Sequence, residues 1–372
     1  MGNRPKRILQ IGNYPPPMCG WAIQTKLVTE ELRRRGHVCE VLKINEDRKV
    51  KHATYIDVQG GLDYVRKVIR HALAGYRLNV HVNGQSKKGY LLALAAVMVG
   101  RLTLCPARVT FHGGLSQAYF PRQDSRVLHW VFKLLFHLAG GIACDSLTIR
   151  QAIESYAIKP GKIAVIETFS VQYLEYEKVS LSSKVETFLL NHHPTFFCYV
   201  SFRPEYRLEV LREAMRRFHE RFPRAGFVWL GFPAKEIPGV EEFVGAWEAK
   251  ERQTLLLLGN LGHDEFLNLL SRCFAYIRTP ACDGVSASVL ESLALGVPVV
   301  ASENGQRPEG VVTYCEGDAA DLCSKLMSVM EHYNEIKAGL GRVRRDDNVG
   351  RMADWLAGEP ASKGSIEVAH AS

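Results

Sequence analysis

An apolar helix that runs directly into an apolar strand occupies residues 283–302 (DGVSASVLESLALGVPVVAS). The helical part ends at Gly296, and Pro298 opens a strand rich in β-branched residues. A strand that is apolar on both faces is typical of a buried, parallel sheet. Parallel neighbours need a crossover, usually a helix, so this segment favours an α/β fold.

Two carboxylates, Asp283 and Glu291, flank the start of this helix. Ser286 and Ser288 suit a helix N-terminus, and Gly296 suits a helix end. Free backbone N–H groups at a helix N-terminus attract anions such as phosphate. We therefore expect an anionic ligand across this end, within reach of Glu291.

The pattern strand, loop, helix, strand appears in both halves of the 372-residue chain, as in doubly wound α/β domains. The expected strands are residues 6–12, 38–44, 78–82, 107–110 and 141–144 in the first half, and 196–202, 227–230, 255–258, 275–278 and 298–302 in the second. The expected helices include residues 22–35, 208–222 and 264–272. Residues 168–195 are polar and read as an irregular junction. We predict two Rossmann-like domains facing across a cleft, with ligands at the carboxyl ends of the strands.

Charge divides unevenly between the halves. Residues 1–170 hold 25 Lys and Arg against 11 Asp and Glu, or +14, and residues 171–372 hold 22 against 28, or −6. The basic half could face a phospholipid surface, a lipid diphosphate or nucleic acid, or be simply solvated. No recognition motif accompanies the charge, so we expect no nucleic-acid partner.

Cysteine usage and hydropathy bear on the compartment. The nine cysteines are scattered without a Cys-x-x-Cys pair, and the sequence opens with no secretory leader, so we expect a reducing cytosol. The longest apolar run, residues 89–100, is too short to cross a bilayer. Residues 122–138 combine basic and bulky apolar side chains at helical spacing, which fits either a core helix or a helix in a membrane interface.

Residues 283–302 resemble the donor-site signature of the retaining glycosyltransferases of the GT-B fold (family 4). The usual form is Glu-Gly-Phe-Gly, four residues, Glu-Ala, a small residue, Gly, and Pro-Val-Val-Ala-Ser. Asp283 replaces the first Glu, and the matching positions are Gly284, Glu291, Gly296, Pro298, Val299, Val300, Ala301 and Ser302. The resemblance implies that Asp283 approaches the transferred sugar and that Glu291 holds the ribose. The alternative is an ordinary helix-to-strand unit, in which Gly-x-Pro-Val-Val is common.

Two segments of the first half also resemble this family. Residues 14–20 (YPPPMCG) stand where the family has Tyr-Pro-Pro and two glycines near the donor diphosphate; Gly20 matches the second glycine and Cys19 replaces the first. His112 follows a predicted strand, where family members have a His that contacts the sugar. A surface turn and a structural histidine are the alternatives.

The cations that balance the leaving diphosphate depart from the family pattern. Family members without a metal use an Arg and a Lys five residues apart, and those positions hold Ser201 and Tyr206 here. Arg203 and Arg207 lie beside them and either replace the pair with shifted geometry or form a solvated helix start. No Asp-x-Asp motif is present, so we expect no metal and no cofactor.

The resemblance thus implies a retaining, metal-independent glycosyltransferase with a nucleotide-sugar donor and a glycan or lipid-diphosphate acceptor, in surface polysaccharide synthesis. Residues 1–170 would bind the acceptor, residues 171–345 the donor, and residues 346–372 could return to the first domain before a frayed tail. The expected location is cytoplasmic, with possible peripheral membrane contact. The implied catalytic residues are Asp283 and His112, and the implied donor-binding residues are Gly20, Arg203, Arg207, Gly284, Val285, Ser286, Ser288 and Glu291. A sugar-nucleotide epimerase of the same fold and a binding or scaffold subunit without transferase activity are the alternatives.

Overall fold

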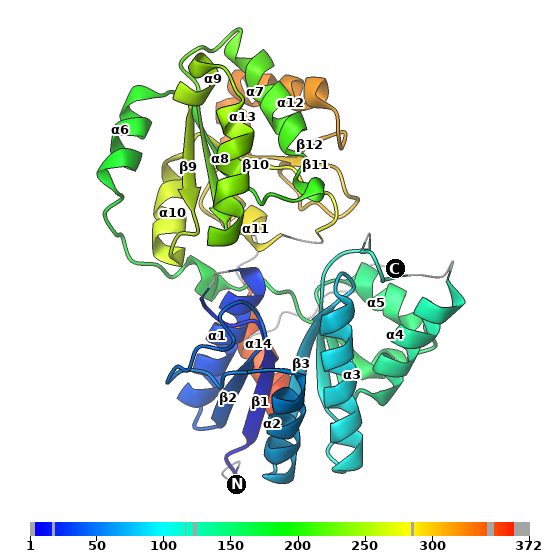
Figure 1. Ribbon diagram of the computed structural model, residues 1–372. Coiled ribbons are helices and arrows are strands. Elements are labelled where there is room, and N and C mark those ends of the chain that lie inside the picture. Colours follow the sequence, from blue (N-terminus) through cyan, green and yellow to red (C-terminus); the bar gives the residue numbers. More distant parts are fainter. Residues whose placement is uncertain are drawn as a thin grey trace. The chain divides into compact units, whose positions relative to one another are not determined.

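The chain forms two compact units in the computed structural model (Figure 1), which describes residues 4–16, 19–115, 117–121, 125–283, 286–340 and 346–360. The first unit comprises Met1–Gln172 together with Arg345–Ser372, and the second comprises Tyr173–Arg344. The boundaries expected from the sequence were residues 170 and 345. The two units are described separately below.

The first unit is a parallel six-stranded sheet in the order β2-β1-β3-β4-β5-β6. Its strands are β1 (Arg7–Gly12), β2 (Val38–Lys43), β3 (Arg77–Asn83), β4 (Arg108–His112), β5 (Gly141–Cys144) and β6 (Ile163–Val165). Its helices are α1 (Gly20–Arg34), α2 (Gly61–Leu73), α3 (Lys87–Leu102), α4 (Arg126–Leu138), α5 (Leu147–Glu154) and α14 (Asn348–Ala357).

The second unit is also a parallel six-stranded sheet, in the order β12-β11-β10-β7-β8-β9. Its strands are β7 (Thr195–Tyr199), β8 (Gly226–Phe232), β9 (Leu255–Gly259), β10 (Ala275–Arg278), β11 (Val299–Ser302) and β12 (Val311–Tyr314). Its helices are α6 (Ser183–Asn191), α7 (Leu208–His219), α8 (Ile237–Gly245), α9 (Ala249–Gln253), α10 (His263–Arg272), α11 (Ala287–Ala294), α12 (Ala319–Glu331) and α13 (Tyr333–Gly339).

The predicted alternation of strands and helices is confirmed, although β6 and β12 lie outside the expected strands and two further segments differ. The segment 168–195 is not irregular throughout, because α6 buries Val185 and Phe188 against the second sheet. These two buried positions lie three residues apart, next to polar residues such as Glu186. The fourth strand is longer than expected and includes His112 as its last residue. His112 is therefore held by strand pairing instead of following the strand.

Each sheet has one point where the strand order reverses. In the first sheet β1 lies between β2 and β3, and in the second sheet β7 lies between β8 and β10. The connections on either side of such a point run in opposite directions and leave a crevice at the carboxyl ends of the two strands, where α/β proteins bind ligands. Ligand sites are therefore expected beside β1 and β3, and beside β7 and β10.

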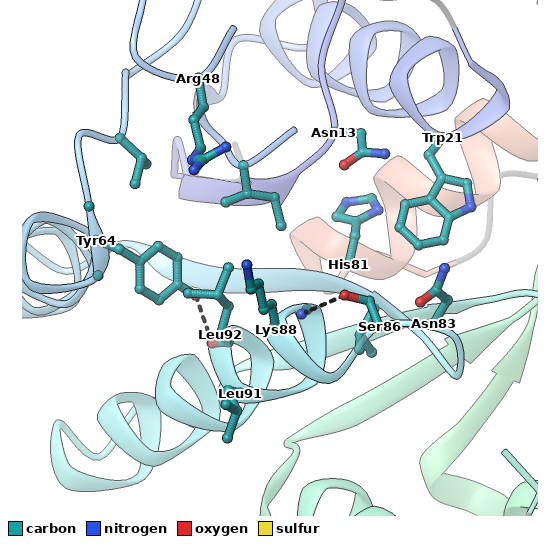
Figure 2. A pocket seen from close by; sticks show the side chains of 16 residues that line it. Asn13, Trp21, Arg48, Tyr64, His81, Asn83, Ser86, Lys88, Leu91 and Leu92 are labelled. Carbon is teal, nitrogen blue, oxygen red and sulfur yellow. Dashed lines mark hydrogen bonds between the residues drawn. The ribbon is translucent and has the colours of Figure 1, made fainter. Parts of the chain in front are cut away.

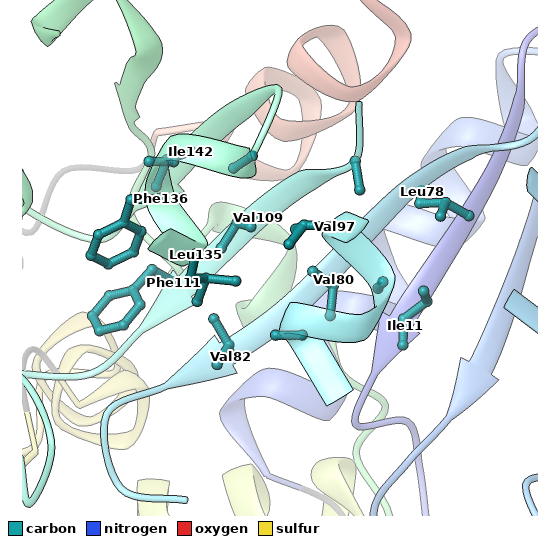
Figure 3. Close-up of a cluster of buried hydrophobic side chains, with 14 of the residues drawn as sticks. Ile11, Leu78, Val80, Val82, Val97, Val109, Phe111, Leu135, Phe136 and Ile142 are labelled. Carbon is teal, nitrogen blue, oxygen red and sulfur yellow. The ribbon is translucent and has the colours of Figure 1, made fainter. Parts of the chain in front are cut away.

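The core of the first unit lies between its sheet and helices α3 and α4 (Figure 3). Phe111 from β4 packs against Phe136 of α4, with ring centroids 5.7 Å apart, and Val97 of α3 lies over the central strands. All three side chains are fully buried. Truncating a buried Phe to Ala typically costs about 3–5 kcal/mol, so this layer holds β3 and β4, and with them His81 and His112, in place.

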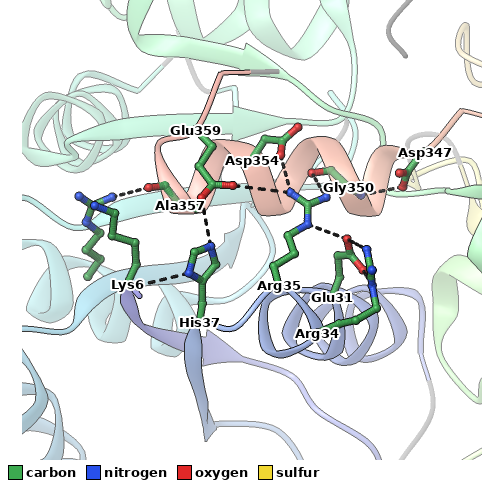
Figure 4. Close-up of polar contacts among 11 residues, drawn as sticks. Lys6, Glu31, Arg34, Arg35, His37, Asp347, Gly350, Asp354, Ala357 and Glu359 are labelled. Atoms are coloured by element: carbon green, nitrogen blue, oxygen red, sulfur yellow. Dashed lines mark hydrogen bonds and ion pairs between the residues drawn. The ribbon is translucent and has the colours of Figure 1, made fainter. Parts of the chain in front are cut away.

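The last helix, α14, packs on α1 of the first unit although more than 300 positions of sequence separate them. Its apolar face, including Met352 and Leu356, is buried. Arg35 after α1 pairs with Asp354 of α14, and His37 lies 3.3 Å from Glu359 (Figure 4). The C-terminal segment thus completes the first unit.

Candidate functional site

The crevice of the second sheet is built around Arg278, the last residue of β10. Its guanidinium is nearly buried and lies 5.6 Å from the ring centroid of Tyr199 and 5.4 Å from that of Tyr206. Tyr199 ends β7, the strand across the reversal point. Burial alone would lower the pKa of Arg278, but the Asp283 carboxylate and its neighbours raise it, so the side chain is a fixed cation.

Asp283 lies between two arginines. Its Oδ2 accepts a hydrogen bond of 2.8 Å from Arg278 Nε, and its Oδ1 lies 3.2 Å from Arg307 Nη1. Arg307 is anchored by the carbonyl oxygens of Ser302 and Pro280, at 2.8 and 2.6 Å. Two guanidinium groups and one carboxylate leave this cluster with a net charge of +1, which suits a site for an anion.

The helix α11 begins beside this cluster with Ser286 as its N-cap. The Ser288 hydroxyl pairs with Tyr276 Oη at 2.8 Å and with Ser286 Oγ at 3.0 Å, so neither hydroxyl caps the helix. Gly284 and Val285 fall outside the described residues. The structure therefore places Asp283, Ser286 and Ser288 together at one helix end, as the sequence suggested.

Glu291 is buried on α11, and its Oε1 lies 2.8 Å from Nε2 of His263, the first residue of α10. The partner of this carboxylate is thus a histidine from the neighbouring helix. A ligand that takes a hydrogen bond with Glu291 would meet His263 as well.

Arg203 and Arg207 lie on the loop and short 3-10 turn after β7, and both are about half exposed. Arg203 Nε lies 3.5 Å from Glu236, and Arg207 Nη2 lies 3.2 Å from Glu316. The Ser201 hydroxyl donates to the same Glu236 at 2.7 Å. The two arginines proposed from the sequence are therefore each paired with a glutamate, whereas Arg278 and Arg307 form the buried cationic group.

Sequence reasoning missed Arg278, Arg307, Glu236 and His263. Arg278 carried a usable signal, because it is a charged residue that ends an otherwise apolar strand, directly before the Asp283 loop. The other three residues reach the site from loops or from another helix that packs on the same sheet. Only the folded chain shows that they meet.

In the first unit, His112 belongs to a buried polar chain. His112 Nε2 lies 2.9 Å from His81 Nδ1, and His81 Nε2 lies 3.0 Å from Gln10 Oε1. Gln10 Oε1 also accepts from Asn79 Nδ2 at 3.1 Å. A Cβ at Gly12 would lie 2.9 Å from His81 Cδ2, so glycine is needed there to leave room for the ring.

The contacts at His81 Nε2 call for opposite protonation states. Gln10 Oε1 can only accept, whereas Asn79 Nδ2, 3.2 Å from the same nitrogen, can only donate. His112 Nδ1 is fully buried and has no hydrogen-bond partner among the described residues. Burial lowers the pKa of His81 to about 4 and that of His112 well below its usual value, so both rings are neutral at pH 7.

Trp21 covers His112 from the first turn of α1, with ring centroids 4.4 Å apart. Gly20, the first residue of α1, precedes it. A pocket of about 630 Å³ opens beside Trp21 and His81 at the carboxyl ends of β1 and β3 (Figure 2). The structure thus brings Gly20 and His112 to the reversal point of the first sheet.

One further titratable group lies at this edge of the first sheet. Asp145 follows β5 and accepts a hydrogen bond of 2.6 Å from the Thr168 hydroxyl. Burial raises its pKa to about 6.

No group of three or more His, Cys, Asp or Glu side chains within the described ranges could hold a metal ion. No helix in the described part of the chain is long and apolar enough to span a membrane.

Comparison of the chain with solved structures finds the same architecture at low sequence identity. The HepE protein of Anabaena in complex with UDP is 13% identical with a TM-score of 0.62, covering 94% of this chain and 95% of that one. A glycosyltransferase from Rickettsia africae is 14% identical with a TM-score of 0.65, covering 95% and 93%. The UDP-GlcNAc 2-epimerase of Methanocaldococcus jannaschii, in complex with UDP-GlcNAc and UDP, is 14% identical with a TM-score of 0.61, covering 94% and 99%.

At these identities the likeness concerns the fold. No curated protein matches the chain in sequence. Residues 183–323 match the family model of glycosyl transferases group 1; this range contains β7, β10, Arg278, Asp283 and Glu291. The chain therefore has the GT-B fold, and residues 183–323 of its second unit match the group 1 glycosyltransferase family, as the sequence resemblance predicted.

Proposed function

We propose that the chain is a retaining, metal-independent glycosyltransferase that transfers a sugar from a nucleotide-sugar donor to a glycan or lipid-linked acceptor in surface polysaccharide synthesis. The observation that carries the proposal is the buried group of Arg278, Asp283 and Arg307 at the reversal point of the second sheet. It supplies fixed cations on the domain that matches the glycosyltransferase family, where the family's own Arg and Lys positions hold Ser201 and Tyr206.

In the proposed reaction, the bond between the anomeric carbon and the β-phosphate oxygen breaks, and negative charge develops on the diphosphate. Preorganised donors in a site with little water stabilise such charge strongly. Arg278 is held by Asp283 and two tyrosine rings, and Arg307 by backbone carbonyls. Neither has to reorganise much to face a phosphate. We assign to these two cations the role that a metal ion has in other transferases.

The donor would lie across the N-terminus of α11. Backbone N–H groups at this end favour phosphate, and Glu291 with His263 offers a hydrogen-bonding pair for the ribose hydroxyls. Asp283 would approach the transferred sugar. Arg203 and Arg207 line the same loop region and would exchange their glutamate partners for phosphate oxygens when the donor binds. Binding of UDP or UDP-sugar by HepE and by the epimerase makes UDP the first nucleotide to test.

The decisive test is calorimetric titration of the purified chain with UDP, GDP, ADP and TDP, with magnesium and with EDTA. We expect micromolar binding of one nucleotide, equal in both buffers, and loss of most of that affinity in Arg278→Gln. Binding that appears only with magnesium would contradict the metal-independent mechanism. If no nucleotide binds under either condition, the scaffold alternative gains support and the transferase proposal fails.

A sugar-nucleotide epimerase is the second candidate, because a UDP-GlcNAc 2-epimerase shares the fold over 94% of this chain. His112, which is neutral, and Asp145, whose pKa is raised, are acid–base groups of the kind that such a reaction needs. Incubation with UDP-GlcNAc in D₂O, without any acceptor, separates the two activities. Deuterium at the sugar C2 and a C2-epimerised product identify an epimerase, whereas an unchanged donor agrees with a transferase that waits for its acceptor.

We also propose that the first unit makes peripheral contact with an anionic membrane through α4. This helix buries Phe132, Leu135 and Phe136 but leaves Val127, Trp130 and Leu134 73%, 64% and 47% exposed.

Those three exposed residues form a stripe at helical spacing on the outer face of α4. Lys133 lies over the Trp130 ring, 4.8 Å from its centroid. An apolar stripe beside cations, on a half with charge +14, suits a surface of anionic lipid headgroups.

Sedimentation with phosphatidylglycerol vesicles tests this contact. Trp130→Glu should abolish sedimentation with these vesicles, and phosphatidylcholine vesicles should not retain the wild-type chain. The matched control is Leu190→Glu, which changes a leucine of the second unit that is 79% exposed. Equal sedimentation of the two variants would contradict the assignment.

A further inference from the structure

The pocket of about 630 Å³ in the first unit is lined by residues of α1, α2, β3 and α3 and of the connections that follow β1, β2 and β3. Asn13 follows β1, Asn83 ends β3, Arg48 lies between β2 and α2, and Lys88 lies in the first turn of α3. Figure 2 shows the Arg48 and Lys88 side chains pointing toward the same part of the pocket, with Trp21 and His81 at its far side. A pocket of this size holds a small ligand.

The charge of the pocket is one-sided. Among the lining residues that the structure describes, the charged ones are Arg48 and Lys88. Neither side chain has a hydrogen bond or an ion pair within the described ranges. Nearby Lys67, in contrast, is paired with both Asp57 and Asp63. Both side chains are exposed and face one cavity without a carboxylate, so an anion between them would meet two unpaired cations.

The backbone around the cavity also favours an anion. The N-termini of α2, at Gly60 and Gly61, and of α3, at Ser86 and Lys88, both contribute to the lining. A Cβ at Gly60 or Gly61 would meet nothing within 4 Å, and neither residue has a positive φ. The protein itself therefore gives no steric reason for either glycine, and the missing Cβ atoms leave the N–H groups of α2 accessible to a ligand.

The rest of the wall is apolar or aromatic. Tyr64, Leu91 and Leu92 line the side next to the cations, and Trp21 lines the opposite side. Leu91 is 61% exposed although it borders the cavity. A bare phosphate ion would leave these surfaces without a partner, whereas a phosphate ester or diphosphate attached to a sugar or a lipid would cover them.

We infer that this pocket binds the phosphoryl group of the acceptor, so that the acceptor is a phosphate-bearing molecule. Calling the ligand an acceptor rests on the proposed function. The pocket itself lies wholly in the first unit, whereas Arg278 and Asp283 belong to the second unit. Arg48 and Lys88 hold the phosphate oxygens, the N-terminus of α2 adds N–H donors, and the apolar wall holds the attached carbon skeleton.

Titration of the full chain with farnesyl diphosphate and with glucose 1-phosphate tests the inference. We expect the wild-type chain to bind at least one of them. The double variant Arg48→Gln/Lys88→Gln should lose about tenfold or more in affinity, since hydrogen bonds to charged groups are worth about that much each. The control double variant, Lys49→Gln/Lys87→Gln, removes the same charge from exposed neighbours that do not line the pocket and should stay within about twofold.

Gly61→Ala is a second test, because we expect this variant to lower the affinity for the probe without lowering the stability of the protein. Alanine favours the first turn of α2, so the melting temperature should hold or rise. Affinity for the phosphate-bearing probe should nevertheless fall, because the new methyl group takes ligand space. A variant with lower stability and unchanged affinity would contradict the role assigned to this helix end.

UDP titrations of the same proteins separate this inference from the proposed function. Unchanged UDP affinity in Arg48→Gln/Lys88→Gln places the two sites apart. If wild type binds a phosphate-bearing probe through Arg48 and Lys88 but no nucleotide, the proposed function fails and the pocket assignment stands. Preference for farnesyl diphosphate indicates a lipid-linked acceptor, and preference for glucose 1-phosphate a soluble one. Absence of binding to both probes, or equal loss in both double variants, overturns the inference.

Discussion

Replacing Asp283 with asparagine is expected to weaken the second unit while strengthening its hold on a nucleoside diphosphate. The carboxylate compensates two arginines, of which Arg307 has a nearly inaccessible side chain. Removing it raises the local charge from +1 to +2 and leaves both cations without their counter-ion. The variant therefore separates the contribution of this carboxylate to folding from its effect on anion binding.

The expected magnitudes follow from the geometry. Removing one partner of a buried pair costs about 3–5 kcal/mol; Asp283 is partly exposed and the amide keeps an acceptor oxygen, so we expect about 2–3 kcal/mol. A carboxylate roughly 6 Å from a phosphate charge repels it by about 1–2 kcal/mol at an effective dielectric constant of about 30–50. Its removal should therefore tighten UDP binding by roughly fivefold to thirtyfold, while turnover falls because the sugar loses its positioning group.

The assay combines urea unfolding with calorimetric UDP titration at low ionic strength. Arg278→Gln is the reciprocal variant and should weaken UDP binding by about tenfold or more. Glu186→Gln is the matched control, because Glu186 forms a short bidentate pair with Arg272, at 2.6 and 2.7 Å, on the exposed surface. It should leave both UDP affinity and stability close to those of wild type.

The reasoning would be refuted if Asp283→Asn bound UDP more weakly than wild type while Arg278→Gln bound it equally well. That result would mean that the carboxylate itself contacts the ligand and that the arginines serve only to hold it. Loss of binding in both variants together with a large fall in stability would instead point to unfolding of the site. Measuring unfolding on the same samples distinguishes the two cases.

Three other predictions concern the first unit. Burial raises the pKa of Asp145 to about 6 from 3.8, so the native state binds this proton more tightly and wild-type stability falls as the pH rises from about 4 to about 6. Asp145→Asn should then raise the free energy of unfolding by up to about 3 kcal/mol at pH 7.5 but only about 1 kcal/mol at pH 4.5, by urea titration. Burial lowers the pKa of His81 to about 4 from 6.5, so the stability that its neutral ring contributes is present above about pH 6.5 and is lost toward pH 4. In His81→Gln, the free energies of unfolding at pH 7.5 and pH 5 should therefore differ less than in wild type. Arg35→Ala leaves nearly buried Asp354 without this partner and should cost about 2–3 kcal/mol. Arg34→Ala removes an exposed arginine from a surface pair and should leave the thermal unfolding transition close to that of wild type.

The sheets were predictable because their signals are local. Residues 298–302 and 141–144 are short apolar runs between turn residues, and the structure has β11 and β5 there. The missed helix α6 shows the limit of that signal. Its buried positions are few, and the polar residues around them match a linker in composition, so only packing against the sheet makes the segment a helix.

The candidate site was predictable only in part, and the missing part is long-range. Asp283 and Glu291 belong to one continuous segment, so their spacing on a loop and helix could be derived from the sequence. Arg307 reaches Asp283 from the loop after another strand, and His263 reaches Glu291 from another helix. No local pattern encodes such a meeting. The prediction therefore named the carboxylates and placed the cations on Arg203 and Arg207, which the structure shows paired with Glu236 and Glu316.

The topology explains why anion sites are expected in both units. Each sheet reverses its strand order once, and each reversal opens a crevice where helix N-termini meet the carboxyl ends of strands. In the second unit, Arg278 at the end of β10 lies at this crevice, and the Asp283 carboxylate between Arg278 and Arg307 compensates part of their charge. In the first unit the cations are Arg48 and Lys88, and no acid among the described lining residues compensates them. The compensated group must exchange part of its counter-charge for the ligand, whereas the uncompensated pair relies on the ligand itself for its counter-charge. A transfer reaction between a diphosphate donor and a phosphate-bearing acceptor would need an anion site for each, and the two units offer one each.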